Sequence, residues 1–180
     1  MTWIQHKFLG HQIDPSTETL IVGTFNPDLD SKINPADFFY GRPRNNLWKL
    51  LPEAFGEESL KGKPKAMKLS FIRKKMIDFV DLISAIEGEP PNFTDTYLDK
   101  LPTDRIRWRD VLSEIDKLPS LKRVGISRKR FKDVPQIEAQ VSKIANHLRK
   151  RKVLFACLHT PARAFRRALP EWTEFFKSNA

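Results

Sequence analysis

TLIVGTFNP, residues 19–27, is the stretch from which the fold of this chain can be worked out. Its first half is an unbroken apolar run, which is typical of a strand covered on both faces of a sheet. Polar groups begin at Gly23, so we expect them in a loop at the carboxyl edge of that strand. Ligands bind at this edge in open α/β sheets. The stretch therefore predicts a strand over residues 19–25 and a binding site directly after it.

The residues that follow describe a pocket for a flat, polar ligand. Gly23 lets the backbone approach closely, Asn26 offers two donors and an acceptor, and Pro27 stiffens the turn. Farther on, FFYGRPR at residues 38–44 supplies three ring faces and two arginines. Rings suit a nucleobase and arginines suit a phosphate.

Length and composition limit what such a pocket can belong to. The chain has 180 residues, of which 40% are apolar, and this is enough for one sizeable core. We therefore expect a single domain over residues 1–180. No apolar run reaches the roughly 18 residues of a membrane span, and the start, MTWIQH, lacks the features of a signal peptide. A soluble protein of the cytoplasm is expected, associated with the nucleoid in a prokaryote, with no membrane partner.

Cysteine and histidine usage argues against a metal centre. Cys157 is the single cysteine, so no disulfide can form within the chain and a four-cysteine zinc or iron–sulfur site is excluded. The four histidines fall at no recognised metal-ligand spacing; they are His6, His11, His147 and His159. We predict no metal and no other cofactor.

The charge balance favours a polyanionic partner. The chain carries 32 basic and 22 acidic residues, a formal net charge of +10. Such an excess promotes binding to nucleic acid through counterion release, although a solvated surface is the alternative interpretation. Basic clusters beside predicted strand–helix junctions favour nucleic acid; they comprise residues 128–132, residues 149–152, and Arg163 with Arg166 and Arg167.

Hydrophobic periodicity predicts an alternation of strands and helices. This pattern is typical of a three-layer α/β/α fold with a central four-stranded, mainly parallel sheet, in which the loops after the first and fourth strands meet. The predicted strands cover residues 19–25, 76–83, 121–126 and 153–158, after an irregular or strand-like arm over residues 1–18. The predicted helices begin near residues 45, 64, 104, 128 and 135, and Pro170 divides a terminal pair. Asp78 and Asp81 flank the second strand and are expected to be exposed to solvent.

Several pieces of the chain, in order, resemble the uracil-DNA glycosylase superfamily. TFNP at residues 24–27 is similar to its first motif, which reads Gly-Ile-Asn-Pro-Gly in the mismatch-specific uracil/thymine branch and Gly-Ser-Phe-Pro in the hypoxanthine branch. YGRPRNNLW at residues 40–48 resembles the Pro-x-Asn-x-Phe-Trp stretch of both branches, and TPARA at residues 160–164 resembles Ser-Pro-Ala-Asn-Ala of the second motif. The resemblance covers about residues 19–168. Asp28 and Arg163 depart from the family pattern.

The resemblance implies a monofunctional DNA glycosylase that acts as a monomer on DNA containing a damaged or mismatched base, without metal or cofactor. A flipped-out uracil or hypoxanthine would stack on Tyr40 or Phe39, beside Gly23, Thr24 and Phe25. The catalytic residues would be Asn26, which positions water or the base edge, Asn45, which contacts the base, and His159, which donates to the leaving base. DNA contacts would come from Arg42, Arg44, Arg128, Lys129, Arg130, Thr160 and Arg163.

Two alternatives belong to other functional classes. The first motif lacks an aspartate and the second is altered, so a catalytically inactive nucleic-acid-binding protein with the same fold remains a competing hypothesis. A phosphate-handling enzyme of another α/β family is disfavoured, because neither a Gly-x-x-x-x-Gly-Lys loop nor a Gly-x-Gly-x-x-Gly turn occurs.

Overall fold

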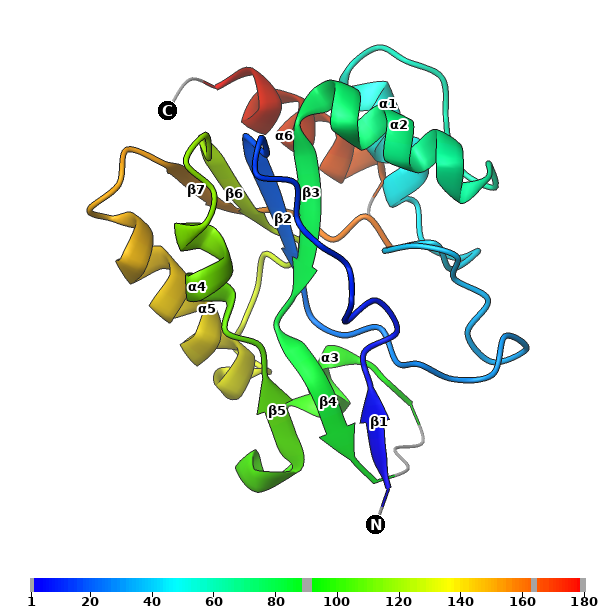
Figure 1. The fold of residues 1–180 in the computed structure, drawn as a ribbon, viewed down its shortest axis with the longest axis vertical. Coiled ribbons are helices and arrows are strands. Elements are labelled where there is room, and N and C mark those ends of the chain that lie inside the picture. Colours follow the sequence, from blue (N-terminus) through cyan, green and yellow to red (C-terminus); the bar gives the residue numbers. More distant parts are fainter. Residues whose placement is uncertain (1, 89–91, 163–164, 179–180) are drawn as a thin grey trace.

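A parallel four-stranded sheet forms the centre of the molecule, as the sequence predicts (Figure 1). The computed structural model describes residues 2–88, 92–162 and 165–178. The strand order is β3-β2-β6-β7, and each neighbouring pair is parallel. These strands are β2 (Thr19–Gly23), β3 (Ile77–Asp81), β6 (Arg123–Ile126) and β7 (Leu154–Cys157).

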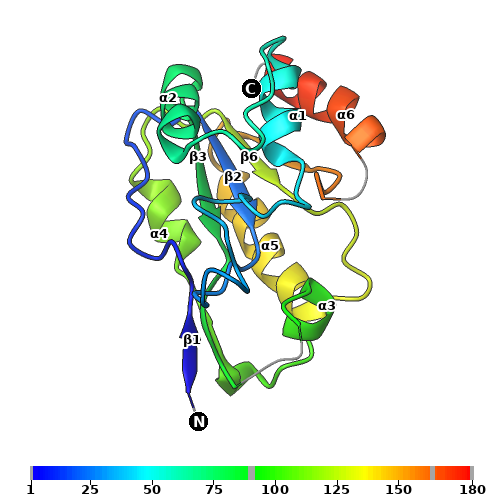
Figure 2. The ribbon, with the colours of Figure 1, turned by 90° about the vertical axis from the view of Figure 1, so that its right-hand side faces the viewer.

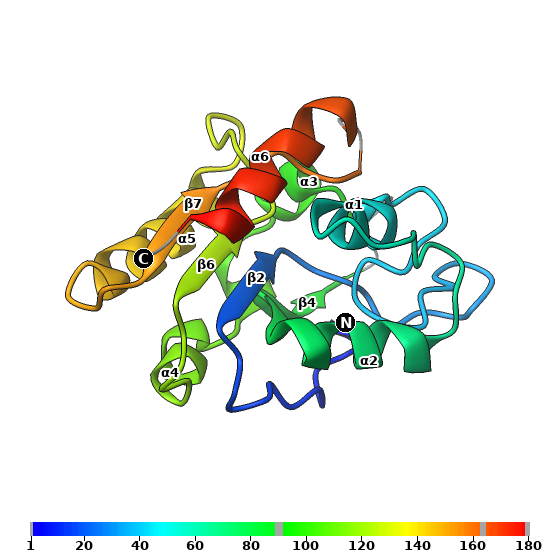
Figure 3. The same ribbon diagram turned by 90° about the horizontal axis from the view of Figure 1, so that it is seen from above.

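Helices cover both faces of this sheet, which explains the unbroken apolar runs of its strands. Leu20 and Val22 point to one face, where α4 and α5 pack, whereas Ile21 points to the other face, against α1, α2 and α6. Figure 3 shows α5 and α6 on opposite sides of β6 and β7. The helices are α1 (Leu47–Ala54), α2 (Lys65–Lys75), α3 (Asp95–Leu98), α4 (Val111–Asp116), α5 (Pro135–Leu148) and α6 (Phe165–Lys177).

A second sheet, which the sequence analysis did not predict, extends the first. Its strands β1 (Trp3–Gln5), β4 (Ile83–Glu87) and β5 (Ile106–Trp108) are antiparallel in the order β1-β4-β5. Figure 2 shows β1 at the opposite end of the molecule from α1 and α6. The strand predicted over residues 76–83 is confirmed as β3, but its predicted end is wrong, because the chain leaves the first sheet after Asp81 and enters the second at Ile83.

Three helix predictions need correction. The helix predicted from Asp104 is instead strand β5 followed by α4, and Asp110 caps α4 by accepting a hydrogen bond from the Ser113 backbone N–H at 3.1 Å. Residues 128–132 form a loop, because this basic run carries no apolar stripe to bury. Pro170 does not divide the terminal helix: α6 continues through it and buries Trp172, although proline offers no backbone N–H at that position.

Within the described residues, no helix is both long enough and apolar enough to cross a membrane.

Candidate active site at the carboxyl edge of the central sheet

Each of the four parallel strands has one residue of interest at or just after its carboxyl end. Asp81 ends β3 and is the register partner of Gly23, which ends β2. Ser127 directly follows β6, and its backbone N–H donates to the Val22 carbonyl at 3.0 Å. His159 follows β7 by two residues. The edge therefore presents Asp81, Gly23, Ser127 and His159 side by side.

Gly23 allows two side chains to meet over the end of β2. A Cβ atom at this position would lie 2.2 Å from Asp81 Oδ1 and 2.5 Å from the Tyr40 hydroxyl oxygen. The sequence-based expectation of a close approach at Gly23 thus has a structural explanation. The approaching groups are a carboxylate and a phenol.

Tyr40 connects the loop after β2 with the loop after β6. Its hydroxyl lies 2.9 Å from Ser127 Oγ, so Ser127 contacts Tyr40 instead of capping the helix that was predicted there. Tyr40 adopts a left-handed backbone with φ of 55°. Burial of the phenol, followed in importance by the negative charge of Asp81, raises the pKa of Tyr40 well above its ordinary value. The hydroxyl therefore stays protonated at neutral pH and can donate a hydrogen bond.

Asn26 is buried and oriented by a second asparagine. Asn26 is 7% exposed and Asn34 is fully buried. Nδ2 of Asn34 donates to Asn26 Oδ1 at 2.7 Å and to the Pro27 carbonyl at 2.6 Å. Asn34 Oδ1 in turn accepts from Arg42 Nε at 3.2 Å. Because Oδ1 of Asn26 is occupied, its Nδ2 donors are the part of the side chain left for a ligand.

His159 belongs to a pair with a glutamate of α6. Glu171 Oε2 accepts hydrogen bonds from the His159 backbone N–H and from Nδ1, both at 2.7 Å. Partial burial alone would raise the pKa of Glu171, but hydrogen bonds from Lys129 and His159 lower it below its ordinary value. Because Nδ1 is engaged with Glu171, Nε2 is the ring nitrogen left to contact a ligand.

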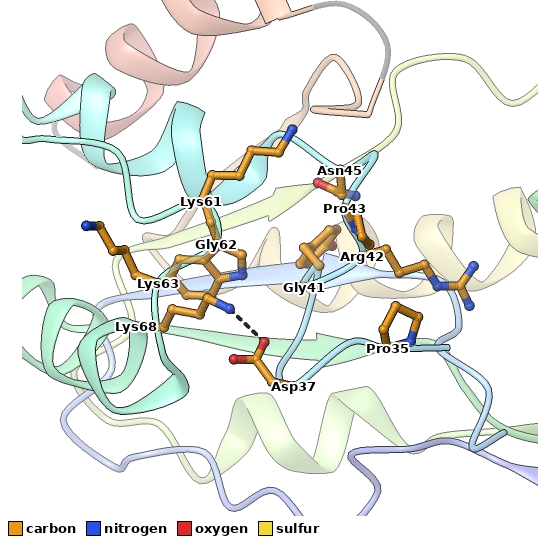
Figure 4. Close-up of a pocket in the computed structure, with 12 residues that line it drawn as sticks. Pro35, Asp37, Gly41, Arg42, Pro43, Asn45, Lys61, Gly62, Lys63 and Lys68 are labelled. Atoms are coloured by element: carbon orange, nitrogen blue, oxygen red, sulfur yellow. Dashed lines mark hydrogen bonds and ion pairs between the residues drawn. The ribbon is translucent and has the colours of Figure 1, made fainter. Parts of the chain in front are cut away.

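A pocket of about 460 Å³ opens beside Tyr40 (Figure 4). Figure 4 shows three lysines on one side of it and Asn45 with Arg42 on the other. Lys68 is 4% exposed and donates to Asp37 Oδ1 at 2.6 Å. The lining residues include Tyr40, Arg42, Asn45, Trp48, Lys61, Lys63 and Lys68, so three of the predicted site residues converge here.

Asn45 has a structural role in addition to lining the pocket. Its Oδ1 accepts a hydrogen bond from the backbone N–H of Leu47, the first residue of α1, at 2.9 Å. The N-cap residue of α1 is Asn46, so Asn45 forms a turn one residue before the cap, and its predicted capping position is off by one. Half-burial lowers the pKa of the neighbouring Arg42, which nevertheless remains a cation at neutral pH.

The remaining predicted substrate residues differ in accessibility. Thr24 and Phe25 are half-buried beside the site. Phe39 is 1% exposed and stacks on Phe79, with ring centroids 5.7 Å apart. Its ring is part of the core, so the prediction that it could stack on a ligand is not supported. Tyr40 keeps that role because it lines the pocket.

The predicted DNA contacts also divide into two groups. Arg128 donates to Asp95 and to Asp133, each at 2.8 Å, and these hydrogen bonds raise its pKa although partial burial opposes the shift. Lys129 pairs with Glu171. Both cations form ion pairs with carboxylates of the protein, and their contact with DNA stays a prediction. Arg44, Arg130 and Thr160 are exposed, whereas Arg163 lies outside the described residues.

The sequence analysis missed the roles of five residues at this edge or along β3. Asp81 is 6% exposed and Asp78 is 3% exposed, so the expectation that both face solvent is wrong. Asn34 and Glu171 were not singled out, and His6 was considered only as a possible metal ligand. For Asp81 a signal was available, because a carboxylate at a parallel strand's end lies at the binding edge. No local signal marks Asn34.

Within the described residues, no group of three or more histidine, cysteine, aspartate or glutamate side chains is arranged to hold a metal ion.

One solved structure allows a direct comparison of the fold. It is a solution NMR structure described as a "putative Uracil DNA glycosylase" from Methanosarcina acetivorans. The TM-score is 0.61, the sequences are 22% identical, and the match covers 92% of each chain. The two chains share a fold. No family model and no curated protein matches the present sequence.

Proposed function

We propose that this chain is a single-domain, monofunctional DNA glycosylase that hydrolyses the bond between deoxyribose and a deaminated or mismatched base, as in base-excision repair. The observation that carries the proposal is that Tyr40 lies against Gly23 and Ser127 at the carboxyl edge of the sheet and lines a pocket there, in a fold shared with the Methanosarcina acetivorans structure. Asn26 and His159 lie on the loops that follow β2 and β7 at the same edge. DNA is the proposed partner, and a monomer in the cytoplasm is the proposed working form.

The chemistry requires that a nucleotide leave the stack, because the glycosidic bond is inaccessible within a duplex. In this proposal the extruded base rests on the ring of Tyr40. The left-handed backbone of Tyr40 and its contact with Ser127 hold the ring in place, which reduces the conformational entropy lost on binding.

Bond cleavage leaves negative charge on the base and positive charge on the sugar. Asn26 Nδ2 would donate to a carbonyl of the base or hold the attacking water, since Asn34 occupies the oxygen of Asn26. His159 would contact the leaving base through Nε2, with Glu171 fixing the ring through Nδ1. Asn45 would contact the base or sugar from the pocket wall. These hydrogen-bond donors stabilise the leaving group without a metal or cofactor.

Positive charge around the pocket would receive the DNA backbone. Arg42, Lys61 and Lys63 line the pocket, and Arg44 is exposed beside it. Arg130 and Thr160 are exposed on the loops that follow β6 and β7. Phosphate contacts of this kind give affinity that falls steeply with salt.

Alkaline cleavage of labelled oligonucleotides tests the proposal. The substrates carry uracil, hypoxanthine, xanthine or a thymine mismatch, and the proteins are wild type, Asn26→Ala and Asn45→Ala. Asn92→Ala is the matched control, because Asn92 is exposed and its side chain contacts Thr94 on the surface. We expect excision of at least one base, a decrease of about 10²-fold or more for Asn26→Ala, and no change for Asn92→Ala.

A protein that binds DNA but excises no base would belong to the competing functional class, the inactive DNA-binding proteins. Tight, salt-sensitive DNA binding with no abasic product from any substrate would exclude the glycosylase and leave a catalytically inactive DNA-binding protein. In that case Asn26→Ala should leave both the affinity and its salt dependence unchanged.

A further inference from the structure

The two outer strands of the central sheet differ in how far the rest of the protein covers them. All five residues of β3 are buried, and the N-terminal arm packs along this strand through hydrogen bonds to Asp78 and Asp81 (Figure 1). At the opposite side of the sheet, all four residues of β7 are half-buried. β7 pairs with β6 and with no other strand of the described residues. One side of the sheet is therefore left open.

The open strand presents backbone groups that can pair with another strand. The N–H groups of Leu154 and Leu158 donate to carbonyls of the β6 segment, each at 2.8 Å. Alternate residues of a strand direct their backbone groups to opposite sides, so those of Phe155 and Cys157 point away from β6. β7 also carries no proline, charged residue or bulge of the kind that blocks pairing at an outer strand. An extended chain beside β7 would find N–H donors and carbonyl acceptors at both positions.

A groove of about 550 Å³ lies beside this strand, where β7 packs on the C-terminal end of α5 (Figure 3). Val153 and Phe155 belong to the α5 face of the sheet, whereas Leu154 and Ala156 belong to the α6 face. A strand added to β7 would likewise place alternate side chains on the α5 face, over the groove. The apolar lining residues are Ala145, Leu148, Val153, Leu154 and Phe155. The groove therefore favours apolar side chains at alternate positions of the added strand.

The basic run at residues 149–152 supplies positive charge to the groove. Arg149, Arg151 and Lys152 line it, and no acidic residue does. Arg151 is held in place, because its guanidinium donates to two backbone carbonyls at the end of α4, at 3.0 and 3.1 Å. Arg149, Lys150 and Lys152 are exposed and form no ion pair with a carboxylate of the described residues. These three cations are available to an acidic ligand.

The basic run lies away from the candidate active site. It directly precedes β7, so it is at the amino ends of the parallel strands, whereas Gly23, Ser127 and His159 are at the carboxyl ends. The DNA contacts proposed for the carboxyl edge therefore leave the cations of this run without a role.

We propose that β7 and the groove beside it bind an extended acidic peptide of a partner protein, which adds a strand to the sheet at Phe155 and Cys157. Carboxylates of the peptide pair with Arg149, Lys150 and Lys152, and its apolar side chains enter the groove at alternate positions. This binding does not depend on the proposed function, because the groove and the active site lie at opposite ends of the strands.

Two other occupants fit the observations less well. The phosphates of a nucleic acid would suit the cations, but they offer no alternating N–H and C=O groups to the backbone of β7. A second copy of this chain would bring together two molecules that each carry a net charge of +10, which opposes self-association.

NMR-detected hydrogen exchange of the full-length protein tests the proposal with defined peptides. Asp-Glu-Asp-Val-Thr-Val-Thr-Val suits parallel pairing, because the basic run lies at the amino end of β7, and Val-Thr-Val-Thr-Val-Asp-Glu-Asp suits antiparallel pairing. Both are acetylated and amidated at their ends. The control peptides have Lys in place of Asp and Glu, or are N-methylated at every Val or at every Thr. Fluorescence anisotropy gives the affinities.

One of the two acidic peptides should bind and slow hydrogen exchange at the amides of Phe155 and Cys157. The Lys peptides should not bind. N-methylation of one of the two residue types should abolish binding, because alternate peptide N–H groups face β7.

Charge reversal in the protein provides an independent readout. The double variant Arg149→Glu, Lys152→Glu should lower the affinity for the acidic peptide about 10-fold or more. The matched control is the double variant Lys100→Glu, Lys143→Glu, which makes the same charge change at exposed positions outside the groove and should bind as wild type does. Thermal unfolding confirms that both double variants are folded.

Each contrary result overturns the proposal. Peptide binding without slower exchange at Phe155 and Cys157 would place the peptide elsewhere on the protein. Slower exchange there with a single-stranded or duplex oligonucleotide, at concentrations at which neither acidic peptide has an effect, would assign the groove to nucleic acid. Slower exchange that grows with protein concentration, together with a dimer in analytical ultracentrifugation, would assign β7 to a second copy. No effect of either acidic peptide at up to about 1 mM would leave β7 as an unoccupied outer strand.

Discussion

The hydroxyl groups of Tyr40 and Ser127 lie 2.9 Å apart, although 87 residues separate them in the chain. They extend from the loops that follow β2 and β6, which are neighbours in the sheet although β3 follows β2 in the chain. The contact lies at the point where the strand order reverses, and the Tyr40 hydroxyl also lies against Gly23 at the end of β2. The geometry at and around this edge leads to five predictions.

Gly23→Ala should damage both the site and the fold. The added methyl would lie 2.2 Å from Asp81 Oδ1 and 2.5 Å from the Tyr40 hydroxyl, so these side chains must move. Overpacking of this kind costs about 1–3 kcal/mol of unfolding free energy. Gly10→Ala is the control, because nothing lies within 4 Å of its Cβ position. In urea unfolding, Gly23→Ala should be less stable than Gly10→Ala. Equal free energies of unfolding for the two variants would contradict the close approach at Gly23.

Asn34→Ala should leave the Asn26 side chain without the hydrogen bond that orients it. The buried Asn34 amide supports Asn26 Oδ1, the Pro27 carbonyl and Arg42 Nε, and its removal leaves these groups without that partner. We expect a loss of about 1–3 kcal/mol in unfolding free energy and an excision rate as low as that of Asn26→Ala. Asn92→Ala provides the comparison. Wild-type excision by Asn34→Ala would show that Asn26 needs no such support.

Ionisation of Tyr40 should require strongly alkaline solution. Its folded pKa is raised above the unfolded value of about 10, so the stability contributed by the protonated phenol is present below about pH 10 and is lost as the pH rises further. The difference between the ultraviolet titrations of wild type and Tyr40→Phe isolates this residue from the other tyrosine of the chain. A transition centred near pH 10 would contradict the enclosed hydroxyl.

In Glu171→Gln, the free energy of unfolding should change less with pH in the acid range than it does in wild type. The pKa of Glu171 is depressed in the folded state, so its contribution is present above the unfolded value of about 4.3 and is lost as the pH falls through the lower folded pKa. The stability gap between wild type and Glu171→Gln should therefore narrow below about pH 4. Denaturant unfolding at neutral and acid pH measures the gap, with exposed Glu138→Gln as control.

Arg128 and Arg130 should behave differently although they are two residues apart. Arg128→Ala removes the contacts with Asp95 and Asp133 and should lower thermal stability, because α3 loses its tie to the loop after β6. Arg130→Ala should leave stability unchanged and lower the salt dependence of DNA binding by about one phosphate contact. A salt titration of DNA affinity, together with thermal unfolding of both variants, tests this division.

The central sheet could be predicted because its information is local. Each strand is a short apolar run, and the run at residues 20–22 ends at Gly23, after which polar groups begin, so both the layer architecture and the edge that carries the site can be predicted. Pro64 and Pro135 correctly marked the starts of α2 and α5. The second sheet was missed because β1 and β5 have three residues each and depend on pairing with β4.

The errors at the site have a common physical cause. Asp81 was expected to be exposed because an isolated carboxylate is rarely buried, and its partner His6 is 75 residues away in the chain. The ion pair of Arg128 was not expected, because the basic cluster is visible locally whereas its partner Asp95 lies 33 residues earlier. A side chain's burial and charge partner are set by tertiary structure, which residue type and local spacing do not encode.

The N-terminal arm supplies His6 and His11 to two carboxylates that β3 buries. Proteolytic removal of the first fourteen residues would take both histidines away while leaving every loop of the carboxyl edge in the chain. Asp81 would then lose the hydrogen bond from His6, and Asp78 would keep the one from the Phe79 backbone N–H while losing those from His11 and Asp14, so two buried carboxylates would be poorly compensated. An event at the extreme amino terminus would thus reach the centre of the molecule, and a fusion tag placed there should be separated from the arm by a flexible linker.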